Sequence, residues 1–412
     1  MSTFSFASTP CGKIPSASAC DEDRTMNERP TDVDLTPGER KRYGRHLIMP
    51  EVGLGGQQKL KAARILVIGI GGLGSPVTMY LAAAGVGTIG IVDDDVIDTS
   101  NLHRQIIYST RDAGEAKLPI AAQRIAAINP LVHIRRYETR LTSANALEIL
   151  KDYDVVVDGT DNFPTRYLVN DACVLLGIPN VYGSIFRFEG RSSVFVPKQG
   201  PCYRCMCPEP PAAGMVPNCA ESGVFGVLPG IIGTIQANEA LKLVLGIGDL
   251  LVGRLLLFDA LSMKFTEIRL RRNPACPICG DTPTIDQLID YEEFCKLGTR
   301  SHPQEETLVP SLSVHQLKEK LDHGEDLFLL DVREQHEYEL VNLKGYLLPV
   351  REIKTRFHEL DPSKEIIVYC HVGGRSAHAV RLLQERGFRK VYNLSGGIDA
   401  WAAEIDLTLP RY

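Results

Sequence analysis

A glycine-rich turn between a strand pattern and a helix pattern is the feature that most constrains the fold. Residues 69–74 read GIGGLG; they end a β-branched run, Ile65–Gly69, and open the helical pattern of Gly74–Ala84. Glycines let the backbone approach a phosphate closely, and a helix N-terminus offers unpaired N–H groups and the positive end of its dipole. Asp93 follows Gly74 by 19 residues, at the end of the next predicted strand, where an acid can bind ribose hydroxyls. We therefore expect a nucleotide site, with a tight turn that binds no ligand as the alternative.

The alternation of strand and helix patterns continues along the first half of the chain. Short apolar runs typical of buried strands are separated by segments with helical spacing of their apolar residues. This order predicts stacked β-α-β units and a mostly parallel sheet, as in Rossmann-like folds. The predicted strands are Ile65–Gly69, Ile89–Val92, Val155–Val157 and Pro179–Tyr182, and the predicted helices are Gly74–Ala84, Glu115–Ile128 and Thr165–Leu176.

A polar segment divides the chain into two blocks. With 412 residues the chain is long enough for two or three domains. We expect a disordered leader over 1–34, a first α/β domain over 35–281, a linker over 282–312 and a small α/β domain over 313–412. In the last of these, Ser313 and Gln316 resemble a capping box that opens a helix ending near Gly324. Leu327–Leu330 and Ile366–Tyr369 are predicted strands of the same domain.

Composition and charge exclude several classes of protein. The net charge of −6 disfavours a broad nucleic-acid surface, so we expect no nucleic-acid partner. The most apolar stretch, Val224–Leu245, is broken by Pro229, Gln236 and Glu239, so we expect no membrane span. The first residues lack the apolar segment of a secretory signal, and we expect a cytoplasmic protein whose 11 cysteines are reduced.

Two cations that follow the predicted ribose acid favour a triphosphate over a dinucleotide. Arg104 lies in the segment Ser100–Gln105, and Lys117 begins the next helical stretch. Cations that converge on one site suit the charge of a triphosphate. Each of them alone would more often be a solvated surface charge, and an NAD-dependent oxidoreductase with a regulatory tail stays open as an alternative.

Asp161 and Asn162 follow the predicted strand Val155–Val157. At the carboxyl end of a parallel strand an aspartate is well placed to hold Mg²⁺. Its other possible role is to cap the helix that starts after Pro164, for which Asp161 or Asn162 would serve equally well.

From Tyr43 to about Gly280 the chain resembles the MoeB/ThiF adenylating enzymes, relatives of the ubiquitin-activating enzyme. The resemblance implies that Mg-ATP binds here and that a carboxylate attacks its α-phosphate to give an acyl adenylate and pyrophosphate. It places Asp93 on the ribose, catalytic Arg104 and Lys117 on the phosphates, and Asp161 on the metal. It also implies a homodimer in which Arg45 reaches the neighbouring subunit's nucleotide. The implied ATP-binding residues are Gly71, Gly72, Gly74, Asp93, Ser100, Asn101, Arg104, Gln105, Lys117, Asp161, Asn162 and Arg45.

Two Cys-x-x-Cys pairs predict a structural Zn²⁺ site, one per subunit. Cys202 and Cys205 form the first pair, Cys276 and Cys279 form the second, and 70 residues lie between the pairs. Each spacing lets two thiolates bind one ion, and four thiolates complete a tetrahedral site without an open position. The separation suits a site that pins a distant segment to the domain. Unrelated buried thiols are the alternative, and Cys207 is left out of the ligand set.

Cys219 lies in the sequence Pro217–Glu221, which matches the catalytic-cysteine position of the same family. In ubiquitin-type relatives this cysteine takes the acyl group as a thioester, whereas in sulfur-carrier activators its role is less defined. It can form a transient acyl disulfide or thioester, or be a half-buried small side chain.

The C-terminal block contains a loop suited to a nucleophilic cysteine. Cys370 follows the strand Ile366–Tyr369, and Gly373, Gly374 and Arg375 precede a helix expected from Ser376. Loop N–H groups, the helix dipole and the Arg375 charge would stabilise a thiolate there. These residues resemble a rhodanese sulfurtransferase domain, whose six-residue loop suits a persulfide and makes Cys370 and Arg375 catalytic residues.

An adenylating domain joined to a rhodanese domain resembles the molybdopterin-synthase adenylyltransferase/sulfurtransferase family. The resemblance implies adenylation of the C-terminal Gly-Gly of a ubiquitin-like sulfur carrier, then sulfur transfer from a Cys370 persulfide to give a thiocarboxylate. It implies a sulfur donor such as a cysteine desulfurase, and a role in molybdenum cofactor synthesis and, in eukaryotic relatives, also in tRNA thiolation. The alternatives are a modifier-activating enzyme that forms a Cys219 thioester for protein conjugation, the oxidoreductase named above, and a non-enzymatic scaffold.

Overall fold

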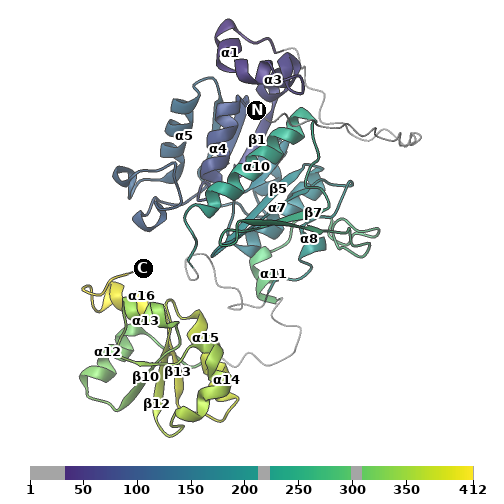
Figure 1. Cartoon of the computed structure of the whole chain (residues 1–412). Coiled ribbons are helices and arrows are strands. Elements are labelled where there is room, and N and C mark those ends of the chain that lie inside the picture. The colour runs from purple at the N-terminus through teal and green to yellow at the C-terminus, as the bar shows by residue number, and fades with distance from the viewer. Residues whose placement is uncertain (1–32, 212–222, 298–308, 412) are drawn as a thin grey trace, which may run out of the picture.

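The computed structural model describes residues 33–211, 223–297 and 309–411, and these contain two separate sheets, each covered by helices (Figure 1). The first has the strand order β3-β2-β1-β4-β5-β6-β7-β8. Its strands are β1 (Arg64–Ile68), β2 (Thr88–Val92), β3 (His133–Tyr137), β4 (Val155–Asp158), β5 (Asn180–Phe186), β6 (Glu189–Phe195), β7 (Arg254–Asp259) and β8 (Lys264–Arg269). The helices around it are α1 (Pro37–Arg42), α2 (Gly44–Leu47), α3 (Gly53–Ala62), α4 (Gly74–Ala84), α5 (Lys117–Ile128), α6 (Ala146–Leu150), α7 (Phe163–Leu176), α8 (Tyr203–Met206), α10 (Leu228–Leu245) and α11 (Tyr291–Leu297).

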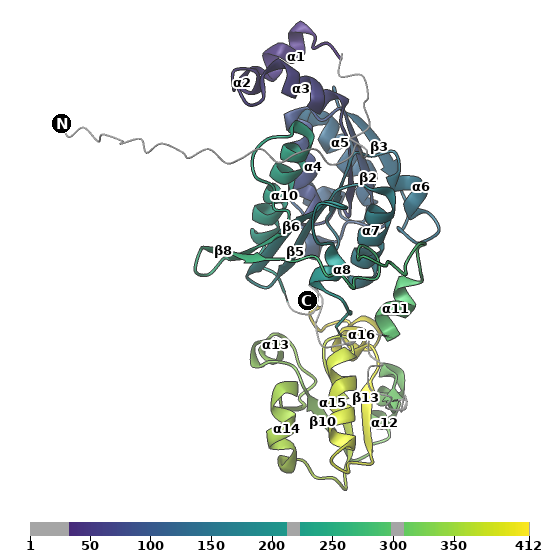
Figure 2. The same cartoon turned by 90° about the vertical axis from the view of Figure 1, so that its right-hand side faces the viewer.

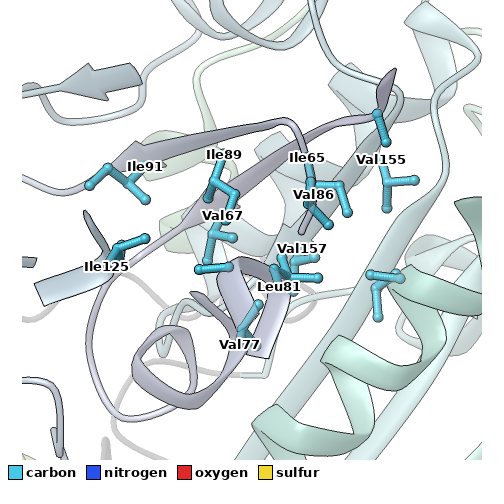
Figure 3. Close-up of a cluster of buried hydrophobic side chains, with 14 of the residues drawn as sticks. Ile65, Val67, Val77, Leu81, Val86, Ile89, Ile91, Ile125, Val155 and Val157 are labelled. Atoms are coloured by element: carbon cyan, nitrogen blue, oxygen red, sulfur yellow. The ribbon is translucent and has the colours of Figure 1, made fainter. Parts of the chain in front are cut away.

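The parallel half of this sheet confirms the expected β-α-β units. β1 lies between β2 and β4, and β3 and β5 extend the sheet on either side, all in parallel. Both faces of β1 are buried: Ile65 and Val67 pack into one apolar cluster with α4, whereas Leu66 and Ile68 pack into the other with α7. Figure 3 shows the first cluster. Burial on both faces explains why this strand reads as a continuous apolar run.

The other half of the sheet is antiparallel, so the sheet is mixed rather than mostly parallel throughout. β5, β6, β7 and β8 pair antiparallel in sequence order. β8 is exposed along its whole length, and β6 begins with polar residues, so neither carries the apolar run that identifies a buried strand.

The apolar stretch near residue 230 forms α10, which packs between α4 and strands β5 and β6. Among the residues that the structure describes, no helix has both the length and the apolar character needed to cross a bilayer.

The predicted linker contains a segment that belongs to the first domain. Leu288, Ile289 and Phe294 pack against the α7 cluster, and Tyr291 is 4% exposed within it. The Tyr291 hydroxyl donates to the buried Asp171 carboxylate at 2.8 Å. The sequence does not indicate these contacts, because the segment is mostly polar and only a few of its residues are apolar.

The second sheet has the order β11-β10-β12-β13-β9 and is parallel throughout. Figure 2 shows it among its helices in the yellow and light-green part of the chain. Its elements are β9 (Ser311–Leu312), α12 (Val314–Asp322), β10 (Leu327–Asp331), α13 (Gln335–Leu340), β11 (Tyr346–Leu347), α14 (Ile353–Arg356), β12 (Glu365–Tyr369), α15 (Gly374–Gln384), β13 (Val391–Leu394) and α16 (Gly397–Glu404). Alternate residues of β12 face two clusters, one covered by α14 and α15, the other by α12 and α16. The capping box at Ser313 is confirmed, and β9 places Ser311–Leu312 in this sheet rather than in the linker.

Candidate active sites

A pocket of about 400 Å³ lies at the carboxyl ends of the parallel strands, a volume in the range of small-molecule sites. The glycine turn after β1 forms its centre, and the ends of β2 and β4 form its sides. Gly74 does not line the pocket. It allows the start of α4 to pack closely against the end of β1, because a Cβ there would lie 2.0 Å from the Gly69 carbonyl oxygen. The structure brings nine predicted ATP-binding residues to the pocket wall: Gly71, Gly72, Asp93, Asn101, Arg104, Gln105, Lys117, Asp161 and Asn162.

Asp93 is fixed by the backbone around it. Its carboxylate accepts hydrogen bonds from the N–H of Ile70 at 2.7 Å and of Asp95 at 2.9 Å. Burial raises the pKa of Asp93, and the nearby Lys117 ammonium opposes that rise. The carboxylate therefore links the glycine turn to the end of β2 and lies in the wall of the pocket.

The two predicted phosphate ligands differ in their charge partners. Lys117 is buried and ion-paired, with Nζ 2.7 Å from a carboxylate oxygen of Asp95 and 3.9 Å from Asp93. The Arg104 guanidinium donates to the Asn101 side-chain oxygen at 2.8 Å and to the Ser100 carbonyl at 3.2 Å. Among the described residues, Arg104 thus has no hydrogen-bonded carboxylate, and it lines the pocket.

Asn162, and not Asp161, caps the helix α7. The Asn162 side-chain oxygen accepts from the Thr165 N–H at 3.0 Å. Asp161 is exposed at the pocket wall and accepts no hydrogen bond from any residue within the described ranges. Asn162 therefore fills the capping role, and the Asp161 carboxylate is available to a ligand.

Two further predicted ATP-binding residues, Ser100 and Arg45, do not line the pocket. Ser100 is exposed beside the pocket and is not part of its lining, although its carbonyl orients Arg104. Arg45 is exposed on α2 and does not line the pocket of its own chain. Cys219 lies outside the described residues.

Arg166 is a buried pocket residue at the β4 end that the sequence patterns do not indicate. It is 9% exposed and stacks against the rings of Phe163 and Tyr182, with its guanidinium carbon 5.7 Å from each ring centre. One terminal nitrogen donates to the Thr160 carbonyl at 3.1 Å. Its position in the sequence could have indicated it, because Arg166 lies one turn into a helix that begins at a predicted ligand-binding loop.

The four cysteines of the two Cys-x-x-Cys pairs converge on one point. Sulfur–sulfur distances are 3.9 Å for Cys202–Cys205, 3.6 Å for Cys202–Cys276 and 3.4 Å for Cys205–Cys279. Zn–S bonds of about 2.3 Å in a tetrahedron place sulfurs about 3.8 Å apart, whereas a disulfide needs about 2.05 Å. The spacing therefore fits one tetrahedral ion. Cys207 lies outside this group and contacts the Tyr167 hydroxyl instead.

Cys370 sits at the end of β12 under the N-terminus of α15. Its sulfur accepts hydrogen bonds from the Gly373 N–H at 3.1 Å and the Ser376 hydroxyl at 3.3 Å. The side chain is 1% exposed, and Gly373 has φ of +101°, which turns its N–H toward the sulfur. This arrangement can stabilise negative charge on a sulfur atom.

Two further contacts hold the cysteine loop. Arg375 forms a bidentate pair with Glu337 of α13, with both N–O distances 2.7 Å. From the other side, Ile398 N–H donates to the Cys370 carbonyl at 2.9 Å, and a Cβ at Gly397 would lie 2.3 Å from the His371 carbonyl oxygen. The glycine at 397 is thus required by the close approach of α16 to the loop.

Comparison with known proteins identifies both parts of the chain. The ThiF family matches residues 43–278, and the Rhodanese-like domain matches residues 313–404. The probable adenylyltransferase/sulfurtransferase MoeZ of Mycobacterium tuberculosis is 46% identical over 388 residues, covering 92% of this chain and 96% of the relative. The adenylyltransferase and sulfurtransferase MOCS3 of Sus scrofa is 43% identical, covering 93% and 90%.

Two shorter matches concern the first domain. The sulfur carrier protein adenylyltransferase of Thermus thermophilus is 56% identical, covering 64% of this chain and 98% of the relative. The crystal structure of Escherichia coli MccB with ATP has a TM-score of 0.52 at 22% identity, covering 58% and 73%, and shows a shared fold. The chain therefore belongs to the ThiF family, as a member of its adenylyltransferase/sulfurtransferases that carry a rhodanese-like domain.

Proposed function

We propose that this protein adenylates the C-terminal glycine of a ubiquitin-like sulfur carrier and then replaces the AMP by sulfur delivered from Cys370. The observation that carries the proposal is the presence in one chain of two sites with complementary chemistry. One is a nucleotide-sized pocket lined by Arg104, which donates to neutral oxygens, and the other is a cysteine whose sulfur accepts hydrogen bonds from an N–H and an O–H group.

In the first half-reaction an oxygen of the carrier's terminal carboxylate attacks the α-phosphorus of ATP. The bond to the bridging oxygen breaks and pyrophosphate leaves, so no protein base is needed for an already ionised carboxylate. Arg104 would balance phosphate charge and Asp93 would bind the ribose; both residues line the pocket. Asp161 is the residue that would hold Mg²⁺, which supplies further charge neutralisation when bound.

In the second half-reaction the outer sulfur of a Cys370 persulfide attacks the carbonyl carbon of the adenylate. AMP leaves, and carrier and enzyme are joined by an acyl disulfide. Attack by a second thiol on the Cys370 sulfur releases the thiocarboxylate and leaves an enzyme disulfide, which an external thiol reductant restores. Cys219 is our candidate for that thiol, and a cysteine desulfurase for the persulfide donor.

The four-cysteine cluster is proposed to hold a structural Zn²⁺. All four ligands come from the protein, so the ion has no position for a substrate. It joins the start of α8 to the loop that precedes the Tyr291 segment. We also propose a homodimer, in which the exposed Arg45 acts at the pocket of the partner subunit, and roles in molybdenum cofactor synthesis and tRNA thiolation.

The test separates the two half-reactions. Cys370→Ala should abolish thiocarboxylate formation, detected as the mass gain from replacing one carrier oxygen by sulfur, and should leave carrier-dependent ATP–pyrophosphate exchange intact. Loss of both activities in a folded variant would contradict this division of labour. A gel-stable thioester on Cys219 that is passed to a second enzyme would instead support protein conjugation.

A further inference from the structure

We infer that Arg166 binds the terminal carboxylate of the incoming carrier and so positions the nucleophile of the adenylation step. This inference rests on the proposed function and assigns a role to a residue outside the ATP-binding set that the family resemblance implies. Three observations support it: the charge partners of the cations in the pocket, the order of the strands, and an unpaired buried donor.

The cations that line the pocket divide into two groups. Lys117 is paired with Asp95 at 2.7 Å, and Arg140 with Glu292 at 3.1 Å. Arg104 and Arg166 donate only to neutral oxygens among the described residues. Adenylation must bring two anions together, a triphosphate and a carboxylate, and the pocket offers two cations without a hydrogen-bonded acid.

The strand order separates these two cations. Across the sheet the strands lie side by side in the spatial order β2, β1, β4, β5. Arg104 belongs to the segment that follows β2 and Asp93. Arg166 follows β4, and Ile185 lies near the end of β5, and both line the same pocket. If the ribose lies at Asp93 and the phosphates lie over the glycine turn, the carboxylate would approach from the side of Arg166.

The Arg166 side chain is built to receive a planar anion. Its Nε is buried and has no hydrogen-bond partner among the described residues. A buried donor without a partner costs free energy, so a ligand that accepts from this group would be favoured. The acidic neighbours are Asp158 and Asp161. Asp158 accepts from the N–H and hydroxyl of Thr160 rather than from Arg166, and burial raises its pKa. Nε and a terminal nitrogen together form the fork that binds a carboxylate in two places.

The experiment compares a sulfur-carrier protein that ends in Gly-Gly with the same protein carrying a C-terminal carboxamide. Both share the docking surface, so the ratio of their dissociation constants from the full-length enzyme isolates the contribution of the carboxylate charge. We expect the wild-type enzyme to prefer the acid by about 10- to 100-fold. Arg166→Gln should reduce this ratio to about twofold or less while the dissociation constant for ATP changes little. Arg166→Lys, which keeps the charge but not the fork, should give an intermediate ratio.

Arg104→Gln is the matched control, and it should weaken ATP binding while the preference for the acid persists. An acid preference that survives Arg166→Gln, or a loss of ATP affinity in Arg166→Lys equal to that of Arg104→Gln, would overturn the inference. If the wild-type enzyme catalyses no carrier-dependent pyrophosphate exchange, the proposed function itself fails. The two failures are therefore distinguishable.

Discussion

Replacing Glu337 by glutamine should destabilise the C-terminal domain by removing the charge that holds Arg375. Burial opposes ionisation of Glu337, but hydrogen bonds from Arg375 and from the Glu334 N–H outweigh it and lower its pKa to about 2. Relative to the ordinary value of 4.5, this corresponds to about 3.4 kcal/mol of stability at neutral pH. The pair is partly screened by solvent, with Arg375 18% exposed, so we expect about 2 kcal/mol.

The sign of the pH dependence follows from the lowered pKa. The contribution is present in full above pH 4.5 and is lost as the pH falls through about 2. The difference between wild type and Glu337→Gln should therefore shrink to roughly 60% of its neutral value at pH 3.5.

The single tryptophan of the chain makes this measurement specific to one domain. Trp401 is 8% exposed in the apolar core of the C-terminal domain, so its fluorescence during urea unfolding reports on that domain alone. We expect the midpoint to fall by roughly 1–2 M. Glu339→Gln, on the exposed face of the same helix, is the control and should change stability by less than about 0.5 kcal/mol. An equal loss in both variants, or a difference that does not depend on pH, would refute the reasoning.

Three further predictions concern the other sites. Gly397→Ala should lower thiocarboxylate formation and the stability of the C-terminal domain while pyrophosphate exchange persists, because the new methyl group would lie 2.3 Å from the His371 carbonyl oxygen; unchanged Trp401 fluorescence unfolding would argue against this. Asp161→Asn should abolish pyrophosphate exchange without lowering the melting temperature, since its side chain is exposed, and normal exchange would exclude it as the Mg²⁺ ligand. Removal of zinc by a chelator should lower the melting temperature of the first domain, and an unchanged melting curve after verified metal loss would count against a structural ion.

The sequence predicted the parallel half of the first sheet because its signals are local. Runs such as Ile65–Ile68 are apolar on both faces, and the glycine turn restricts the backbone within six residues. The antiparallel strands β6 to β8 were not predicted from the sequence. They are stabilised by hydrogen bonds to the neighbouring strands, and their own residues do not form the apolar run of a buried strand. The exposed β8 shows this clearly, since it is held by pairing with β7 and buries no face.

For the sites, residue types and spacing determined which chemistry the chain can perform. Each Cys-x-x-Cys pair, the glycine turn and the Cys370 loop is a short segment whose residue types and spacing already limit the chemistry that it can support. The tertiary structure decided what depends on distant segments: that the two Cys-x-x-Cys pairs meet at one point, that Arg375 is paired with Glu337, and that Arg166 is buried beside the pocket. Burial and charge pairing are properties of groups brought together across the fold, and no local pattern records them.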